Sequence, residues 1–170
     1  MNAKPVYIGV DPAFRAGGFW ACVLDMQDRS VRFIAYRDLL HWHDWLRSGD
    51  APDQAFVAVE NSNAQNKTFA RHLTGKVSEQ VRKSRNVGTN QAVSQLAYES
   101  AVRHYGQSRV FSVSPQDKGR KYTPAQFAQV VQQDGVTLPP GTNNQDQRDA
   151  YKLADIARRL ALVNRQFATP

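Results

Sequence analysis

Hydrophobic positions along the chain follow two kinds of spacing, and together they predict an α/β fold. Short apolar runs rich in Val, Ile and aromatic residues are typical of strands, and five are expected, at residues 5–10, 18–24, 31–36, 55–60 and 110–113. Apolar residues three and four positions apart are typical of amphipathic helices. Such helices are expected at residues 38–47, from residue 89 or 90 to about 105, and at 124–133 and 146–163.

The order of these elements predicts the arrangement of the sheet. Short polar connections join the first three strands, which favours an antiparallel meander. A helix separates the third strand from the fourth, so the fourth strand should lie parallel to the first. The polar and basic residues 61–85 are expected to be partly helical. No internal repeat or linker interrupts the chain, so residues 1–170 are expected to form a single domain.

Acidic residues stand at the ends of two expected strands and at the start of the last expected helix. Asp11 ends the first strand, where Pro12 stops the ladder because it has no N–H to donate, and Glu60 ends the fourth strand. Asp146 and Asp149 are three residues apart, so both point from one face of the last helix. We expect the fold to bring these four carboxylates together around divalent metal.

Each of these acids also has an ordinary explanation. Asp146 could be a helix N-cap, Glu60 a solvated acid at a strand end, and Asp149 a favourable charge near the helix dipole. As a set beside basic loops, the four acids favour a catalytic metal site. Carboxylate oxygens suit Mg²⁺, and two ions roughly 3.5–4 Å apart can activate water and stabilise the leaving oxygen in phosphodiester hydrolysis.

The net charge indicates what kind of partner the chain could bind. Its 22 Lys and Arg residues against 15 Asp and Glu residues give a net charge of +7 and a pI near 9.8. This balance favours a polyanionic partner, nucleic acid before an anionic membrane, although a basic protein without such a partner fits the composition equally well. Basic residues gather before the long helix and after the fifth strand, where they are expected to contact phosphates; the alternative is an ordinary solvated surface. They are Lys67, Arg71, Lys76, Arg82, Lys83, Arg85, Lys118, Arg120 and Lys121.

Other sequence features narrow the class of protein. The single cysteine, Cys22, excludes an internal disulfide and lies in an apolar pattern typical of the core. No apolar run approaches membrane-spanning length, and the N-terminus has no signal-peptide pattern. An intracellular protein that does not contact membranes is therefore expected.

The order of expected elements resembles the ribonuclease H-like fold, in which helices flank a five-stranded mixed sheet of order 3-2-1-4-5. Within that order, three segments resemble the RuvC family of Holliday-junction resolvases. The resemblance covers about residues 5–160 and is strongest in the first and last of these segments. They are Ile8-Gly9-Val10-Asp11-Pro12, the strand end Val59-Glu60, and Asp146-x-x-Asp149-Ala150-x-x-Leu153-Ala154.

The resemblance implies a function and a set of roles. It makes Asp11, Glu60, Asp146 and Asp149 the catalytic ligands of two Mg²⁺ or Mn²⁺ ions, and it places Lys118 at the family's catalytic lysine position. It also implies a homodimer that binds a four-way DNA junction and resolves it by paired nicks. The helix expected over residues 89–105 has apolar positions on two sides, so one side could serve the dimer.

The sequence departs from the family pattern in three places. Arg15 lies in the segment after Asp11-Pro12 where glycine is usual, Asn63 stands where an aromatic wedge is usual, and residues 65–85 are longer and more basic. Two other functions stay open: another ribonuclease H-like nuclease that cuts RNA, hybrid or single strands, and a non-catalytic nucleic-acid-binding module. The presence of all four acids argues against the module.

Overall fold

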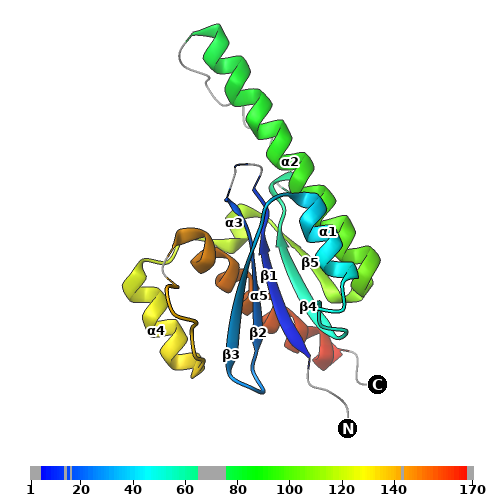
Figure 1. Cartoon of the computed structure of the whole chain (residues 1–170), viewed down its shortest axis with the longest axis vertical. Coiled ribbons are helices and arrows are strands. Elements are labelled where there is room, and N and C mark those ends of the chain that lie inside the picture. The colour runs from blue at the N-terminus through cyan, green and yellow to red at the C-terminus, as the bar shows by residue number, and fades with distance from the viewer. Residues whose placement is uncertain (1–4, 14, 16, 65–75, 143, 168–170) are drawn as a thin grey trace.

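A five-stranded sheet forms the centre of the computed structural model, which describes residues 5–13, 15, 17–64, 76–142 and 144–167, with side chains as far as residue 164 (Figure 1). The strand order is β3-β2-β1-β4-β5, with β1 antiparallel to β2 and parallel to β4, which is in turn parallel to β5. This is the predicted ribonuclease H-like arrangement. The strands are β1 (Val6–Asp11), β2 (Phe19–Asp25), β3 (Ser30–Tyr36), β4 (Ala55–Glu60) and β5 (Val110–Val113).

Helices cover both faces of the sheet (Figure 1). On one face, α1 (Leu39–Arg47) packs against α2 (Val77–Tyr105), which lies over β4 and β5. On the other face, α5 (Gln145–Phe167) crosses β1, β2 and β4, and α4 (Pro124–Asp134) contacts α5 through the edge-to-face pair Phe127–Tyr151. The short elements are η1 (Ser62–Ala64), η2 (Gln107–Arg109) and α3 (Pro115–Lys118).

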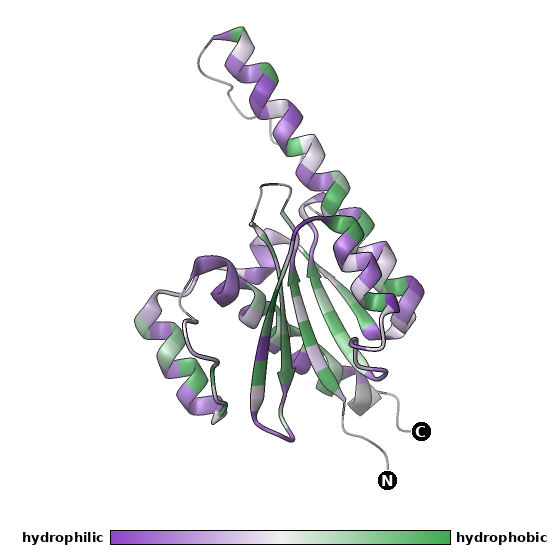
Figure 2. Cartoon of the chain, viewed as in Figure 1, coloured by the Kyte–Doolittle hydropathy of each residue, from purple (hydrophilic) through white to green (hydrophobic). Residues whose placement is uncertain are grey.

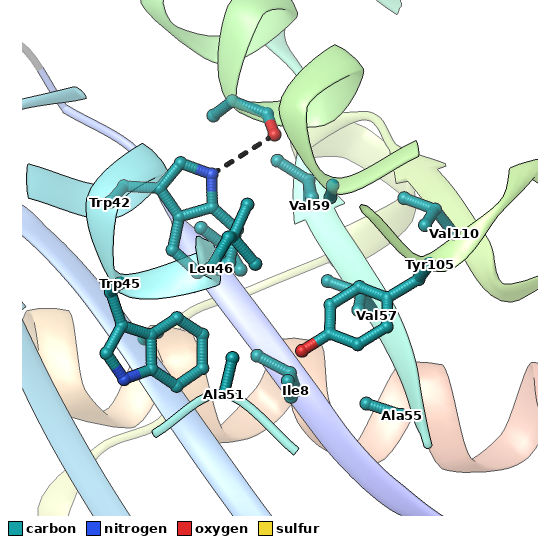
Figure 3. Close-up of a cluster of buried hydrophobic side chains, with 14 of the residues drawn as sticks. Ile8, Trp42, Trp45, Leu46, Ala51, Ala55, Val57, Val59, Tyr105 and Val110 are labelled. Atoms are coloured by element: carbon teal, nitrogen blue, oxygen red, sulfur yellow. Dashed lines mark hydrogen bonds between the residues drawn. The ribbon is translucent and has the colours of Figure 1, made fainter. Parts of the chain in front are cut away.

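The alternation of side chains along the strands builds a separate core on each face. Ile8, Val10, Val57 and Val59 pack beneath α1 and α2, where Trp42 donates a 3.3 Å hydrogen bond to the Ala97 carbonyl (Figure 3). The intervening residues of β1 and β4 face α5 and its buried alanines. Because Asp11 and Glu60 follow the same alternation, both belong to the α5 side of the sheet.

The contact between β1 and α5 depends on glycine at position 9. A Cβ atom added to Gly9 would lie 2.0 Å from the carbonyl oxygen of Ala150 and 2.2 Å from the backbone nitrogen of Ala154. No side chain fits in that space, so glycine lets the backbone of α5 lie directly against the strand. This contact fixes the first turns of α5 beside the end of β1.

The long helix α2 begins at Val77, well before the predicted start at residue 89 or 90. The prediction relied on apolar periodicity, which ends where the helix leaves the sheet, whereas the Gln, Lys, Arg and Glu residues before that point are good helix formers in their own right. Within α2, Leu96 is 48% exposed, whereas Ser94 is buried. Leu160 of α5 is also exposed, at 37%.

Residues 77–90 of α2, here called the arm, project beyond the sheet, and none of their side chains is buried (Figures 1 and 2). The hydropathy colouring shows mostly polar residues along this half of the helix (Figure 2). Among the described helices, none combines the length and the apolar character needed to cross a membrane.

Replacing Gly9 tests the contact that positions α5. Gly9→Ala should lower the free energy of unfolding by about 3 kcal/mol, because the added methyl group forces two backbones apart. Gly88→Ala is the matched control: no other part of the described chain comes within 4 Å of its Cβ position, so it should stabilise helix α2 by about 0.5–1 kcal/mol. Urea denaturation measures both, and a Gly9→Ala variant as stable as the parent would contradict the close packing.

Candidate functional site

Two of the predicted site acids lie side by side at the carboxyl edge of the sheet. In the parallel pair of β1 and β4, Val10 is opposite Val59, and Asp11 and Glu60 follow as the last residues of their strands. Both belong to the face that α5 covers. The prediction that Asp11 and Glu60 lie at the same end of neighbouring strands is therefore confirmed.

The start of α5 brings the other two acids to the same edge. Asn144 caps the helix: its side chain accepts a 2.7 Å hydrogen bond from the Gln147 backbone N–H, and its own N–H donates to the Gln147 side chain. The helix begins at Gln145, so Asp146 and Asp149 lie in its first turns, next to the contact with Gly9. The Asp149 side chain is only 3% exposed.

Lys118 lies between the strand acid and the helix acid. Ser114 caps α3, at whose end the Lys118 ammonium contacts Glu60 Oε2 and lies 3.3 Å from Asp149 Oδ2. Its side chain is 7% exposed. Asp117, next to Lys118 in the sequence, accepts a 2.7 Å hydrogen bond from the Ser114 hydroxyl.

Three further residues surround the acids, and the sequence analysis did not assign them to the site. Arg15 NH2 donates to both oxygens of Asp146, at 2.5 and 2.7 Å, and Gln145 donates a 2.7 Å hydrogen bond to Asp149 Oδ1. Lys152 of α5 follows Asp149 by three residues and is close enough for the two charges to interact. Helical spacing could have revealed Gln145 and Lys152, whereas Arg15 arrives from a loop that gives no periodic signal.

The charges in the site are strongly coupled. Burial, reinforced by the Glu60, Asp149 and Asp146 carboxylates, raises the pKa of Asp11 to about 7, against the opposing effect of Lys118. Burial would lower the pKa of Lys118, but the attraction of Asp11, Glu60 and Asp149 outweighs it and raises that pKa above its ordinary value. The site is therefore a region where extra positive charge is favoured and extra negative charge is not.

The donor set fits a hard divalent cation, although two basic side chains now contact it. Among the described residues, no three His, Cys, Asp or Glu side chains are arranged to hold a metal ion in this conformation. Lys118 and Arg15 contact oxygens of Glu60, Asp149 and Asp146 instead. Carboxylate oxygens are the ligand type that Mg²⁺ and Mn²⁺ prefer, but in this structure basic side chains pair with them.

The predicted phosphate-binding residues fall into two described groups. Arg120 and Lys121 are exposed just after α3, and Lys121 Nζ lies 3.7 Å from Asp149 Oδ2. The second group lies on the arm and at its first end, and all its members are exposed: Lys76, Arg82, Lys83 and Arg85. Lys67 and Arg71 lie outside the described residues.

Two polar contacts join the acid edge to helix α2. Asn61, directly after Glu60, donates a 2.9 Å hydrogen bond from its side chain to Gln95, and its backbone N–H donates to the Val113 carbonyl. The hydroxyls of Ser62 and Ser94 lie 3.2 Å apart. The arm therefore extends from the part of α2 that is bonded to the residues immediately after the site.

Comparisons with protein-family models, with curated proteins and with solved structures gave no match. The fold and the site geometry are thus the observations from which a function can be inferred.

Substituting Asp11 tests the electrostatics of the metal-free site. The native state favours protonated Asp11, so stability is lost as pH rises from about 4 to about 7 and the carboxyl ionises. Asp11→Asn should therefore raise the free energy of unfolding by about 1–3 kcal/mol at pH 8 in EDTA, and by much less near pH 4. Asp44→Asn, an exposed change on α1, should have little effect at either pH. Equal stability of the Asp11→Asn variant and the parent at pH 8 would contradict the coupling.

Proposed function

We propose that the chain is a metal-dependent nuclease that hydrolyses phosphodiester bonds in nucleic acid. The observation that carries this proposal is the convergence of four carboxylates from β1, β4 and α5 at one sheet edge, beside a buried lysine and exposed basic residues. Clusters of coupled ionisable groups of this kind mark catalytic sites more often than structural ones.

A purely structural role explains the cluster less well. Buried ion pairs contribute little net stability, because desolvation offsets much of the attraction. Within the part of the chain that the structure describes, Asp11 forms no ion pair, and its raised pKa shows that its charge is unfavourable there. Such a position is costly for folding and useful for binding a cation.

In the proposed reaction, Asp11, Glu60, Asp146 and Asp149 hold two Mg²⁺ or Mn²⁺ ions. When bound, the ions supply an activated water and stabilisation of the leaving oxygen. Lys118, next to two of these carboxylates, is close enough to the site to supply positive charge to the reacting phosphate. Arg120 and Lys121 are exposed at the same edge, where they bind the flanking phosphates.

The arm supplies a second, longer surface for the nucleic-acid backbone. Its fourteen residues span about 21 Å at the helical rise, and Glu79 is the single acid among the basic residues of this helical half. This half of the helix is mostly polar and has no buried side chain, so it gains little stability from core packing, and contact with a polyanion would stabilise it.

The resemblance to the RuvC family favours a four-way DNA junction as the substrate and a homodimer as the active assembly. Exposed Val77, Val81 and Leu96 give α2 an apolar surface for a second copy. Tyr98 and Val102 of the same helix are partly buried against the chain's own core. The alternatives are a ribonuclease H-like nuclease that cuts RNA, hybrid or single strands, and a non-catalytic binding module.

A substrate panel distinguishes these functions. Labelled four-way junction, duplex, single strand and RNA–DNA hybrid are incubated with the protein and Mg²⁺, and the solution mass is measured by light scattering. We expect paired nicks in the junction and a mass near twice 19.1 kDa. A monomer that cuts hybrid or single strands would favour the second nuclease class, and binding without cleavage in Mg²⁺ or Mn²⁺ would favour the module.

Substituting Asp149 should separate cleavage from binding. Asp149→Asn keeps the shape of the side chain but removes a ligand charge, so the cleavage rate should fall by about 10³-fold or more while nucleic-acid binding is kept or tightened. Asp28→Asn, in the exposed β2–β3 turn, should cut at the parent rate. Cleavage by Asp149→Asn at the parent rate would remove the helix acids from the mechanism.

The arm makes its own prediction for binding. Arg82→Ala, Lys83→Ala and Arg85→Ala should each weaken duplex or junction binding and flatten the plot of log affinity against log salt by about 0.9 per lost phosphate contact. Arg47→Ala is the control. Arg47 is exposed at the end of α1, from which the chain runs to the start of β4, and Glu60 lies at the other end of that strand. Unchanged salt slopes in all three arm variants would show that the arm does not contact the backbone.

A further inference from the structure

We infer that Lys118 and Arg15 are internal counter-ions of the acid cluster, which neutralise it in the metal-free protein and are displaced when metal binds. Displacement would convert both side chains into groups that can bind substrate phosphate. The inference rests on the proposed metal-dependent function and adds a defined exchange of cations to it.

The contacts of Lys118 carry the first part of the inference. Its ammonium contacts Glu60 Oε2 and lies 3.3 Å from Asp149 Oδ2, so one charge serves two carboxylates from different elements. At 7% exposure its side chain is nearly enclosed by them. A divalent ion bound to the same oxygens would lie within a few ångströms of the ammonium, and like charges at that distance repel strongly in a poorly solvated site.

Arg15 carries the second part independently, because it comes from the loop between β1 and β2. One guanidinium nitrogen holds both oxygens of Asp146, at 2.5 and 2.7 Å. Together, Arg15 and Lys118 contact oxygens of three of the four acids. Exposed Lys121 adds a more distant contact, 3.7 Å from Asp149 Oδ2, so a divalent ion would compete with basic side chains for these carboxylates.

The exchange requires both side chains to move away from the acids. The Arg15 side chain is 69% exposed, so it can turn into solvent without disturbing the core. Lys118 is the last residue of the four-residue helix α3 and is followed by Gly119 at φ 74°, which ends the helix abruptly. In the proposed exchange, rotation of the long lysine side chain would carry its ammonium from the carboxylates toward exposed Arg120 and Lys121.

Lysine acylation of the unmodified chain tests the exchange without substrate. Lys118 should react slowly with an N-hydroxysuccinimide ester in EDTA and about fivefold or more faster in saturating Mn²⁺, as its ammonium leaves the acids. Lys83 on the arm is exposed and remote, so its reactivity should not change. Mass spectrometry of the digested protein reads each lysine separately.

Metal affinity, measured by calorimetry without nucleic acid, tests the same inference through variants. Lys118→Met should bind Mn²⁺ about tenfold more tightly than the parent, and Arg15→Ala about threefold more tightly, because the ion no longer competes with an internal cation. Arg15→Ala alters an exposed side chain and so keeps the test available if Lys118→Met does not fold. Arg37→Ala, whose guanidinium pairs with exposed Asp38, is the control and should bind as the parent does.

The outcomes separate this inference from the proposed function. If Mn²⁺ binds the parent but acylation of Lys118 stays slow, the counter-ion exchange is wrong and the metal-dependent nuclease stands. The same conclusion follows if both variants bind Mn²⁺ no more tightly than the parent does. If Mn²⁺ does not bind the parent at all, both are wrong. Faster acylation of Lys118 in Mn²⁺, together with tighter Mn²⁺ binding by the Arg15→Ala variant, would support the exchange.

Discussion

The direct contact of helix α5 with strand β1 at Gly9 is the constraint on which the candidate site depends. A side chain at this position would overlap the backbone at Ala150 and Ala154, so the helix lies against the strand only because position 9 has no Cβ. Asp149 is the residue before Ala150, and Asp11 is two residues after Gly9 in the strand. The same short contact that completes the core therefore brings an acid of the helix to an acid of the sheet.

The electrostatic result of this packing is unfavourable for a protein without a ligand. Four carboxylates gather at an edge with little access to water, and burial with mutual repulsion raises the pKa of Asp11. Lys118 and Arg15 relieve part of the repulsion through their contacts with Glu60, Asp149 and Asp146. The pair of Lys118 with Glu60 and Asp149 is buried and adds little net stability, which is consistent with the proposed role of this edge in binding a cation and a phosphate.

Much of the fold could be predicted from the sequence because strand alternation and strand-end acids are local patterns. Asp11 and Glu60 were placed correctly, since parallel strands end at the same edge of a sheet. The early start of α2 was missed because residues 77–90 have no buried side chain and so carry no apolar period. The ion pair of Lys118 and the position of Arg15 depend on how loops meet the sheet, which spacing along the chain does not encode.

The position of bound metal can be measured directly. Crystals soaked in Mn²⁺ and recorded at a wavelength where manganese scatters anomalously would locate the ions without reference to the protein phases. We expect anomalous peaks among the carboxylates of Asp11, Glu60, Asp146 and Asp149, with the Lys118 ammonium moved away from Glu60. Fully soaked crystals that show no peak at this edge, with Lys118 still between Glu60 and Asp149, would contradict a metal-dependent site.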